Sequence, residues 1–300
     1  MEFLRLLAEH RVPALDIFFQ SITYFAQETL VILIICWIYW CRSKKLAYTL
    51  GFTYFISGLL VQGLKITFRI PRPWILDPDF TPVPSAVPAA TGYSFPSGHT
   101  QSGTALFSIL GFASSRKILR TLCIFMTAAI GFSRLYLGVH TPKDVLVSLI
   151  LTLLISIIIW KISPALTGPF AKDRKVTLLM ALFSAALLLY AFGLQKSGAL
   201  PLSEASDCFK ACGAGLGFAA GYYLERHRIR FSHPVTRRSQ VICFFLGIAG
   251  TLILQQGLKP LLGSSLIAGT IRYFIVVFWI LALYPLLFSL VRKGSRQKSY

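Results

Sequence analysis

Three cationic side chains lie close together in the stretch KITFRIPRP, at Lys65, Arg69 and Arg72. Spacings of four and three residues place them on one face of a helix, although Pro71 should end that helix near Ile70. A lone cation near a helix end usually just extends its charged group to water. Three cations in so short a stretch favour a bound anion instead.

A second cluster, Pro96-Ser97-Gly98-His99, opens an apolar stretch that we expect to be helical. The first N–H groups of a helix have no partner within it, and they carry a partial positive charge that binds phosphate well. His99 adds a titratable group beside them. This stretch therefore predicts an anion-binding helix start with an acid or base next to it.

The third cluster, SRLYLGVHTPKD, contains Arg134, His140 and Asp144. Thr141, Pro142 and Asp144 have the order of a helix start, with Thr141 as its cap. Asp144 also lies one helical turn after His140, close enough to hold a ring N–H and fix the tautomer. A carboxylate in so apolar a stretch is costly without a role. We therefore expect Asp144 to orient His140 as well as to cap the helix.

Together, the three clusters supply what phosphoryl transfer needs: fixed cations for the phosphoryl oxygens, a group that attacks and a group that protonates the leaving oxygen. Of the five histidines, His10, His227 and His233 have no such neighbours, and we expect them at interfaces or in loops. No Asp, Glu and His group at metal-ligand spacing accompanies the cations, so we expect neither a metal nor another cofactor.

The elements that must position these clusters are membrane-spanning helices. Of the 300 residues, 55% are hydrophobic and only 14% are charged, whereas a soluble domain has roughly a quarter charged. Apolar runs of about 20 residues are long enough to cross a hydrocarbon layer of roughly 30 Å. We expect an all-α fold, a polytopic transmembrane helical bundle after an amphipathic helix at 2–26. Its nine spans fall near 27–41, 46–66, 99–115, 121–139, 143–163, 176–194, 206–224, 240–258 and 270–291.

The net charge of +19 arises from short basic clusters between apolar runs, which is typical of cytoplasmic loops. A nucleic-acid partner would need a soluble basic face, and the sequence offers none. Most basic residues fall on one side of the alternating spans: Arg42, Lys44, Lys45, Arg116, Lys117, Arg120, Lys161, Lys172, Arg174, Lys175, Arg226, Arg228, Arg230, Arg237, Arg238, Arg292, Lys293, Arg296 and Lys298. We expect that side to be cytoplasmic, and the three clusters to lie at the outer face.

The longest outer loop, 70–98, is rich in proline and unusually apolar. Its prolines forbid a regular helix: Pro71, Pro73, Pro78, Pro82, Pro84, Pro88 and Pro96. We expect this loop to pack on the membrane surface, an arrangement compatible with a lid over the site.

The three clusters, Lys65-x6-Arg72-Pro73, Pro96-Ser97-Gly98-His99 and Ser133-Arg134-x5-His140-x3-Asp144, resemble the three-part motif of the type-2 phosphatidic acid phosphatase superfamily. That resemblance implies a metal-independent phosphatase. His140 would be the nucleophile that forms a phosphohistidine, Asp144 would orient it, and His99 would protonate the leaving group and later help activate water. The residues implied to hold the phosphoryl oxygens are Lys65, Arg72, Ser97, Gly98 and Arg134.

The motif covers 65–144 directly, and the span pattern extends the resemblance to 1–165. We therefore expect a membrane phosphatase core at 1–165 and a transmembrane extension at 166–300, as in longer members that include sphingosine phosphate phosphatases and glucose 6-phosphatase. Gly213, Gly217 and Gly221 recur every four residues in the extension, which favours close helix packing. The alternatives are a homodimer face or a substrate groove.

The preferred interpretation is an integral membrane enzyme that removes phosphate from a lipid, such as a polyprenyl pyrophosphate, phosphatidylglycerophosphate, phosphatidate or sphingoid phosphate. It would act at the outer face of a bacterial plasma membrane, or in the lumen of the endoplasmic reticulum of a eukaryote. One alternative is a phosphatase of a soluble ester. Another is a non-catalytic lipid transporter or sensor on the same scaffold, although a purely binding site would not need His99 and Asp144 together.

Overall fold

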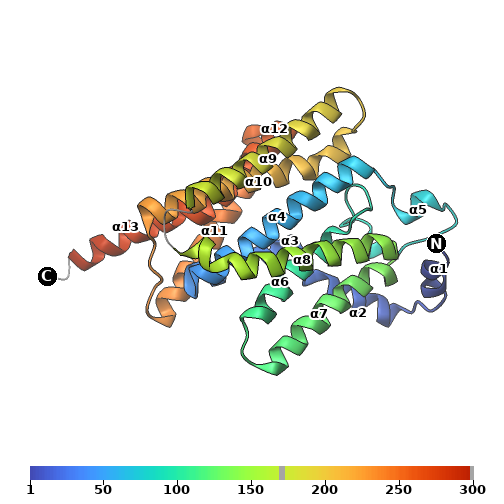
Figure 1. The fold of residues 1–300 in the computed structure, drawn as a ribbon, viewed down its shortest axis with the longest axis horizontal. Helices are drawn as coiled ribbons and strands as arrows, with labels where there is room; N and C mark the ends of the chain where they lie inside the picture. The colour runs from blue at the N-terminus through green and yellow to red at the C-terminus, as the bar shows by residue number, and fades with distance from the viewer. Residues whose placement is uncertain (169–172, 298–300) are drawn as a thin grey trace. The chain divides into compact units, whose positions relative to one another are not determined.

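The computed structural model describes residues 1–168 and 173–297, which form helices and connecting segments (Figure 1). Two basic residues assigned to cytoplasmic loops, Lys172 and Lys298, lie outside these ranges. The helices are α1 (Glu2–Glu9), α2 (Pro13–Tyr24), α3 (Glu28–Cys41), α4 (Lys44–Phe68), α5 (Pro73–Leu76), η1 (Pro84–Ala86), α6 (Gly98–Ala113), α7 (Lys117–Tyr136), α8 (Pro142–Thr167), α9 (Asp173–Lys196), α10 (Leu202–Leu224), η3 (Glu225–Ile229), α11 (Arg237–Leu262), α12 (Leu266–Phe278), η4 (Trp279–Leu283) and α13 (Tyr284–Gln297). The expected all-α class is confirmed.

Six segments of the described chain are long and apolar enough to cross a membrane: Lys44–Leu76, Lys117–Tyr136, Pro142–Thr167, Asp173–Lys196, Arg237–Leu262 and Leu266–Arg292. The pair α2 and α3, bent by 41°, would be a seventh if it forms one span. The polytopic membrane fold is confirmed, whereas the count of nine spans is not.

Two of the expected spans account for the difference between nine spans and the seven counted with the bent pair. Helix α6 has only 16 residues, and at a rise of about 1.5 Å per residue it covers about 24 Å, less than the apolar layer of a bilayer. Helix α10 is longer, but it carries Glu204, Asp207 and Lys210 in its first turns. These charges and its glycines make it less apolar than the six segments above.

The chain divides into two compact units that interleave along the sequence. The first unit comprises Met1–Ile32, Phe52–Lys161 and Leu194–Cys208, and it contains all three polar clusters. The second comprises Leu33–Gly51, Ile162–Gly193 and the chain from Phe209 onward. Five helices contribute residues to both units: α3, α4, α8, α9 and α10.

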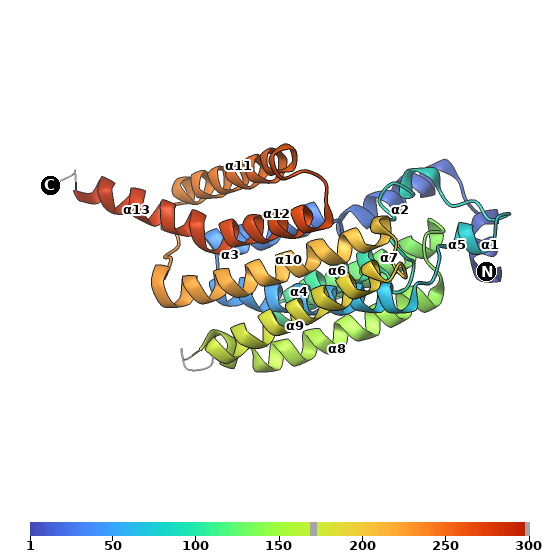
Figure 2. The same ribbon diagram turned by 90° about the horizontal axis from the view of Figure 1, so that it is seen from above.

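Within the first unit, α6 and α7 lie side by side (Figures 1 and 2). Gly103 permits the close approach of α6, because a Cβ there would lie 2.8 Å from Ile130 on α7. The hydroxyl of Ser108 on α6 bonds that of Ser156 on α8 at 2.7 Å. These contacts fix the helices whose ends carry the polar clusters.

The proline-rich loop packs on the protein itself. The N–H of Val83 donates to the carbonyl of Leu137 at 3.0 Å, and Val83 belongs to a buried apolar cluster with Ala86, Tyr136 and Val139. The N-terminal residues tie the loop down further, since Arg5 pairs with Asp77 at 2.7 Å and Arg11 donates to the carbonyl of Thr81 at 2.6 Å. The loop thereby covers the chain that leads into His140.

In the second unit, the glycine face of α10 packs against α12 and η4 of the same molecule. A Cβ at Gly213, Gly217 or Gly221 would overlap Thr270, Phe274 or Leu281 respectively. The predicted close helix packing is therefore confirmed. A homodimer through this face would require α12 to leave it.

Candidate active site

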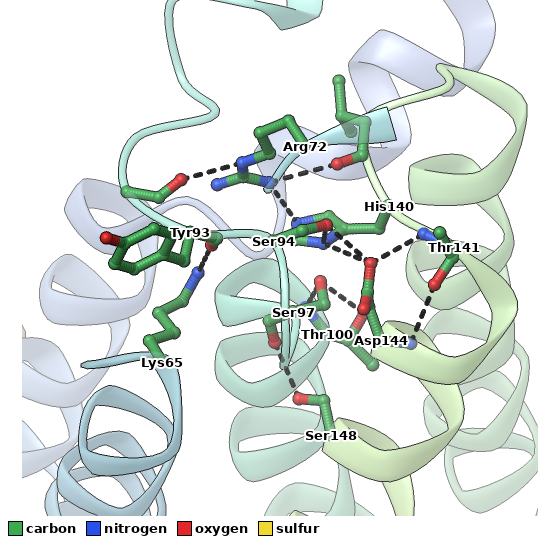
Figure 3. Close-up of polar contacts among 12 residues, drawn as sticks. Lys65, Arg72, Tyr93, Ser94, Ser97, Thr100, His140, Thr141, Asp144 and Ser148 are labelled. Carbon is green, nitrogen blue, oxygen red and sulfur yellow. Dashed lines mark hydrogen bonds and ion pairs between the residues drawn. The ribbon is translucent and has the colours of Figure 1, made fainter. Parts of the chain in front are cut away.

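The chain turns at the end of α4, and this turn separates the three cations of the first cluster. Helix α4 ends at Phe68, and Arg69 adopts a left-handed conformation with φ 50°. Its exposed guanidinium donates to the carbonyl of Ala199 at 2.8 Å. Lys65 and Arg72 are instead buried and point into the site (Figure 3). Two of the three cations therefore reach the site.

Arg72 holds His140 in one tautomer. The Arg72 Nη1 group donates to His140 Nε2 at 2.9 Å and to the carbonyl of Val139 at 3.1 Å. A guanidinium can only donate hydrogen bonds, so Nε2 must accept with its lone pair. The proton of the neutral ring then lies on Nδ1, on the side that faces Asp144.

Asp144 caps α8 and is linked to His140 by a bridging serine. Its Oδ2 accepts from the Thr141 N–H at 2.7 Å, and the Thr141 hydroxyl accepts from the Asp144 N–H at 3.4 Å, so the predicted cap is confirmed. His140 Nδ1 lies 3.6 Å from Oδ2, beyond hydrogen-bond length. Ser94 bridges the gap, because its Oγ donates to Oδ2 at 2.6 Å and lies 3.4 Å from Nδ1 (Figure 3).

The Ser97 hydroxyl serves as the N-cap of α6. It accepts from the N–H of Thr100 at 3.3 Å and from the Thr100 hydroxyl at 2.9 Å. Main-chain contacts join this helix start to α8, since the Ser97 N–H donates to the Asp144 carbonyl at 3.1 Å and the Ser148 hydroxyl donates to the Ser97 carbonyl at 2.7 Å. A Cβ added at Gly98 would meet nothing within 4 Å, so the backbone there is open to a ligand.

Arg134 is fully buried at the end of α7, and its charge is uncompensated. Its Nη1 donates to the hydroxyl of Thr23 on α2 at 2.8 Å. Its Nε and Nη2 have no hydrogen-bond partner among the described residues. A buried guanidinium with unpaired donors is costly, which marks Arg134 as a ligand for an anion. His99 lies within electrostatic range of Arg134, Arg72 and His140.

The surroundings of His140 favour its neutral form. Burial lowers the pKa of His140 well below the usual 6.5, and the charges of Arg72, Arg134 and Lys65 lower it further. The ring is therefore neutral at pH 7. Its Nε2 lone pair lies among cations, where a phosphoryl group would be held.

Sequence reasoning missed Ser94 and Thr23. Ser94 lies in a loop without periodicity, and Thr23 lies on α2, far from the motif in sequence. Neither position carries a local pattern that links it to Asp144 or Arg134. Both are found only through contacts between distant segments.

Comparison with known proteins decides the family. The model of the PAP2 superfamily matches residues 46–167, and that of the PAP2 superfamily phosphatase transmembrane extension matches 209–296. Undecaprenyl-diphosphatase BcrC of Bacillus subtilis is 34% identical over 52% of this chain and 79% of its own length. The chain belongs to the PAP2 superfamily.

Two further matches cover parts of the chain. Phosphatidylglycerophosphatase B of Escherichia coli is 34% identical over 29% of this chain and 37% of its own length. The solved structure of LpxE from Aquifex aeolicus is 28% identical and covers 53% of this chain and 93% of that chain, with a TM-score of 0.46. The PAP2 match spans all three polar clusters, and neither model covers 168–208. The chain is thus an integral membrane protein of a phosphatase family, as its motif predicted.

Proposed function

We propose that this PAP2 protein is a lipid phosphatase that acts through a phosphohistidine on His140, with a polyprenyl diphosphate as its substrate. The observation that carries the proposal is the hydrogen bond from Arg72 to His140 Nε2. It leaves Nε2 unprotonated and places it beside the cations. A nucleophile for phosphorus needs this arrangement.

The reaction balances with the residues of the site. Lys65, Arg72, Arg134 and the N–H groups at the start of α6 hold the phosphoryl oxygens. His140 Nε2 attacks the terminal phosphorus, and the bond to the oxygen that bridges the two phosphates breaks. The protonated ring of His99 gives its proton to that oxygen, so that the lipid monophosphate leaves. Water, deprotonated by His99, then attacks the phosphohistidine and releases phosphate and neutral His140.

Arg72 and Asp144 have different tasks in these steps. The Arg72 N–H must leave Nε2 when the lone pair attacks, and a phosphoryl oxygen becomes its new acceptor. The cationic phosphohistidine ring keeps its proton on Nδ1, where Ser94 and Asp144 stabilise the positive charge. The charge that develops during the reaction is therefore stabilised on both sides of the ring, by Arg72 at the phosphoryl oxygen and by Ser94 and Asp144 at Nδ1.

An apolar cavity in the first unit favours a lipid over a soluble ester. It has a volume of about 550 Å³, lies between α6, α7 and α8, and is lined mainly by apolar side chains, among them Phe107, Ile124, Leu149, Leu153 and Trp160. Its lining begins at Thr104, five residues after His99 on α6. An apolar chain in this cavity would leave its phosphate near the histidines.

The choice of a diphosphate rests on the broader match to undecaprenyl-diphosphatase BcrC than to phosphatidylglycerophosphatase B. We place the site at the outer face, because the spans α4, α7 and α8 carry basic residues at the ends opposite to the site: Lys44 and Lys45, Lys117 and Arg120, and Lys161. A cysteine introduced at Ser85 should then react with a membrane-impermeant thiol reagent in intact cells. Labelling only after permeabilisation would put the site on the cytoplasmic side.

The test of the proposed function is a hydrolysis panel with purified protein. We expect the highest kcat/KM for undecaprenyl diphosphate, lower values for phosphatidylglycerophosphate and phosphatidate, and little activity on glucose 6-phosphate. Activity should persist in EDTA and fall with vanadate, and labelled substrate should leave acid-labile phosphate on His140. Loss of activity in EDTA that a divalent cation restores would refute metal independence. Binding of these lipids without any turnover would instead support a transporter or sensor.

A further inference from the structure

Three consecutive carbonyl groups accept hydrogen bonds from the two buried cations of the first cluster. Lys65 Nζ donates to the carbonyl of Tyr93 (Figure 3). Arg72 Nε donates to the carbonyl of Gly92 at 2.9 Å, and Arg72 Nη2 donates to that of Thr91. The segment Thr91–Tyr93 has no helix or strand of its own. The orientation of Lys65 and Arg72 therefore depends on where this irregular segment is held.

The segment is anchored at both ends. After Tyr93, the Ser94 N–H donates to the carbonyl of Ile70 at 2.8 Å, and its hydroxyl donates to Asp144. Before Gly92, the Thr91 hydroxyl donates to Asp207 Oδ2 at 2.6 Å. One anchor lies within the PAP2 match, and the other, Asp207 at the start of α10, lies between the two family matches.

The first turns of α10 face this segment, and both belong to the first compact unit. Gly92 has φ +65°, and a Cβ there would lie 3.7 Å from Glu204 Oε2 and 4.0 Å from Asp207 Oδ2. Both carboxylates also lie within electrostatic range of Lys65 and Arg72. Asp207 differs from Glu204 in its hydrogen bond to Thr91.

We propose that Asp207 is a positioning residue: through Thr91 it holds the carbonyls of 91–93 against Lys65 and Arg72, and so fixes the cations that bind the phosphoryl group. This inference rests on the proposed function for its effect on catalysis. It assigns a task at the active site to α10, a helix beyond the motif-bearing core. Misplacement of a catalytic group by about 1 Å can lower a rate on the order of 100-fold.

A purely electrostatic account makes a different prediction. If Asp207 acted only by compensating the charges of Lys65 and Arg72, then Asp207→Asn would remove its effect and Glu204→Gln would act similarly. If it acts by holding Thr91, then Asp207→Asn should retain its effect, because an amide oxygen still accepts the Thr91 hydroxyl. The two accounts therefore separate on isosteric variants.

The experiment measures kcat and KM for undecaprenyl diphosphate in six variants: Asp207→Ala, Asp207→Asn, Thr91→Val, Thr91→Ser, Glu204→Gln and the Asp207→Ala/Thr91→Val double variant. We expect Asp207→Ala and Thr91→Val each to lower kcat on the order of 10-fold, with a smaller change in KM. The double variant should be no worse than Asp207→Ala, because that variant already removes the hydrogen bond between Thr91 and Asp207. Asp207→Asn, Thr91→Ser and Glu204→Gln should stay within about twofold of the unmodified protein.

A second measurement does not depend on turnover. Hydrogen–deuterium exchange of the backbone in 87–95 should be faster in Asp207→Ala and Thr91→Val, and unchanged in Asp207→Asn and Thr91→Ser. Unchanged exchange in the first two variants, or additive losses in the double variant, would overturn the inference. An unmodified protein that hydrolyses no lipid phosphate would refute the proposed function, while the exchange data would still decide whether Asp207 holds the segment.

Discussion

The buried charges of the two compact units differ in whether they form an ion pair within the protein. In the second unit, Glu225 is fully buried and accepts from Lys44 at 2.7 Å and from the Phe231 N–H at 2.9 Å. Asp173 is also fully buried, and it accepts from Arg226 at 2.8 Å. Each carboxylate there meets a cation and a further donor, so its charge is compensated inside the protein.

In the first unit, by contrast, the buried cations donate no hydrogen bond to a carboxylate among the described residues. Lys65 and Arg72 donate to main-chain carbonyls, and Arg134 keeps two donor atoms without a partner among the described residues. Asp144, the buried carboxylate beside them, bonds Ser94 and Thr141. A buried charge that is left unpaired costs stability, so it persists where a ligand supplies the partner. The difference separates a structural ion pair from a binding site.

Loss of the proposed nucleophile is the most severe way to test this contrast. Removal of the His140 ring should abolish measurable turnover. Enzymes accelerate phosphate-monoester hydrolysis by up to about 10²¹-fold, so the uncatalysed rate is too slow to detect. The cations are untouched, so His140→Ala should still bind vanadate. Hydrolysis at an ordinary rate by His140→Ala would exclude the covalent mechanism.

How much of this contrast is visible in the sequence depends on the range of the interaction. The cap at Thr141 and the end of α4 before Pro71 are local, and the sequence predicted both correctly. The motif also named Arg72, His140 and Asp144, which the structure brings together. The Ser94 bridge and the Asp207 contact join segments distant along the chain, and no periodicity connects such segments.

The count of nine spans is not confirmed, for a related physical reason. Apolar composition alone suggested that 99–115 and 206–224 cross the membrane, but α6 is short and α10 begins with charged residues. Two of those charged residues, Glu204 and Asp207, face the segment 91–93. A functional contact thus weakened the signal on which span prediction depends.

Exchange of one charge in each unit should separate activity from stability. Arg134→Met removes an unpaired buried cation, so we expect kcat/KM to fall on the order of 10²–10³-fold while the thermal unfolding midpoint is kept or raised. Glu225→Ala leaves Lys44 unpaired, so it should lower the free energy of unfolding by about 3 kcal/mol with kcat retained. Activity and unfolding are both measured on protein in detergent, and the unfolding measurements are made without substrate. A lower unfolding midpoint for Arg134→Met would contradict the interpretation that the Arg134 guanidinium binds a ligand and does not stabilise the fold.

The pH profile would sharpen the contrast through His140. Burial and the nearby cations lower the pKa of this imidazole, so the neutral nucleophile persists as the pH falls through 6.5. The acid limb of kcat/KM, which reports groups of the free enzyme, should therefore lie below pH 6.5. In Arg72→Gln, which lacks one of these cations, the limb should move to higher pH. A limb that does not move would belong to the substrate or to another group.

The mildest change concerns Thr23, which reaches the site from α2. Thr23→Val keeps the shape of the side chain but removes the hydroxyl that accepts from Arg134 at 2.8 Å. A hydrogen bond to a charged group contributes about 1.5–3 kcal/mol, and part of that loss should appear as an approximately tenfold lower kcat/KM because the guanidinium is less well oriented. Thr23→Ser should restore the activity. Ser21→Ala is the matched control, because among the described residues the Ser21 hydroxyl bonds only the Ile17 carbonyl within α2. In the second unit, the comparable change Tyr222→Phe removes a hydroxyl donated to Asp173 at 2.9 Å. It should lower the unfolding midpoint and leave kcat/KM unchanged. If Thr23→Val behaved like Tyr222→Phe, then Arg134 would be a structural charge as well, and the contrast between the two units would fail.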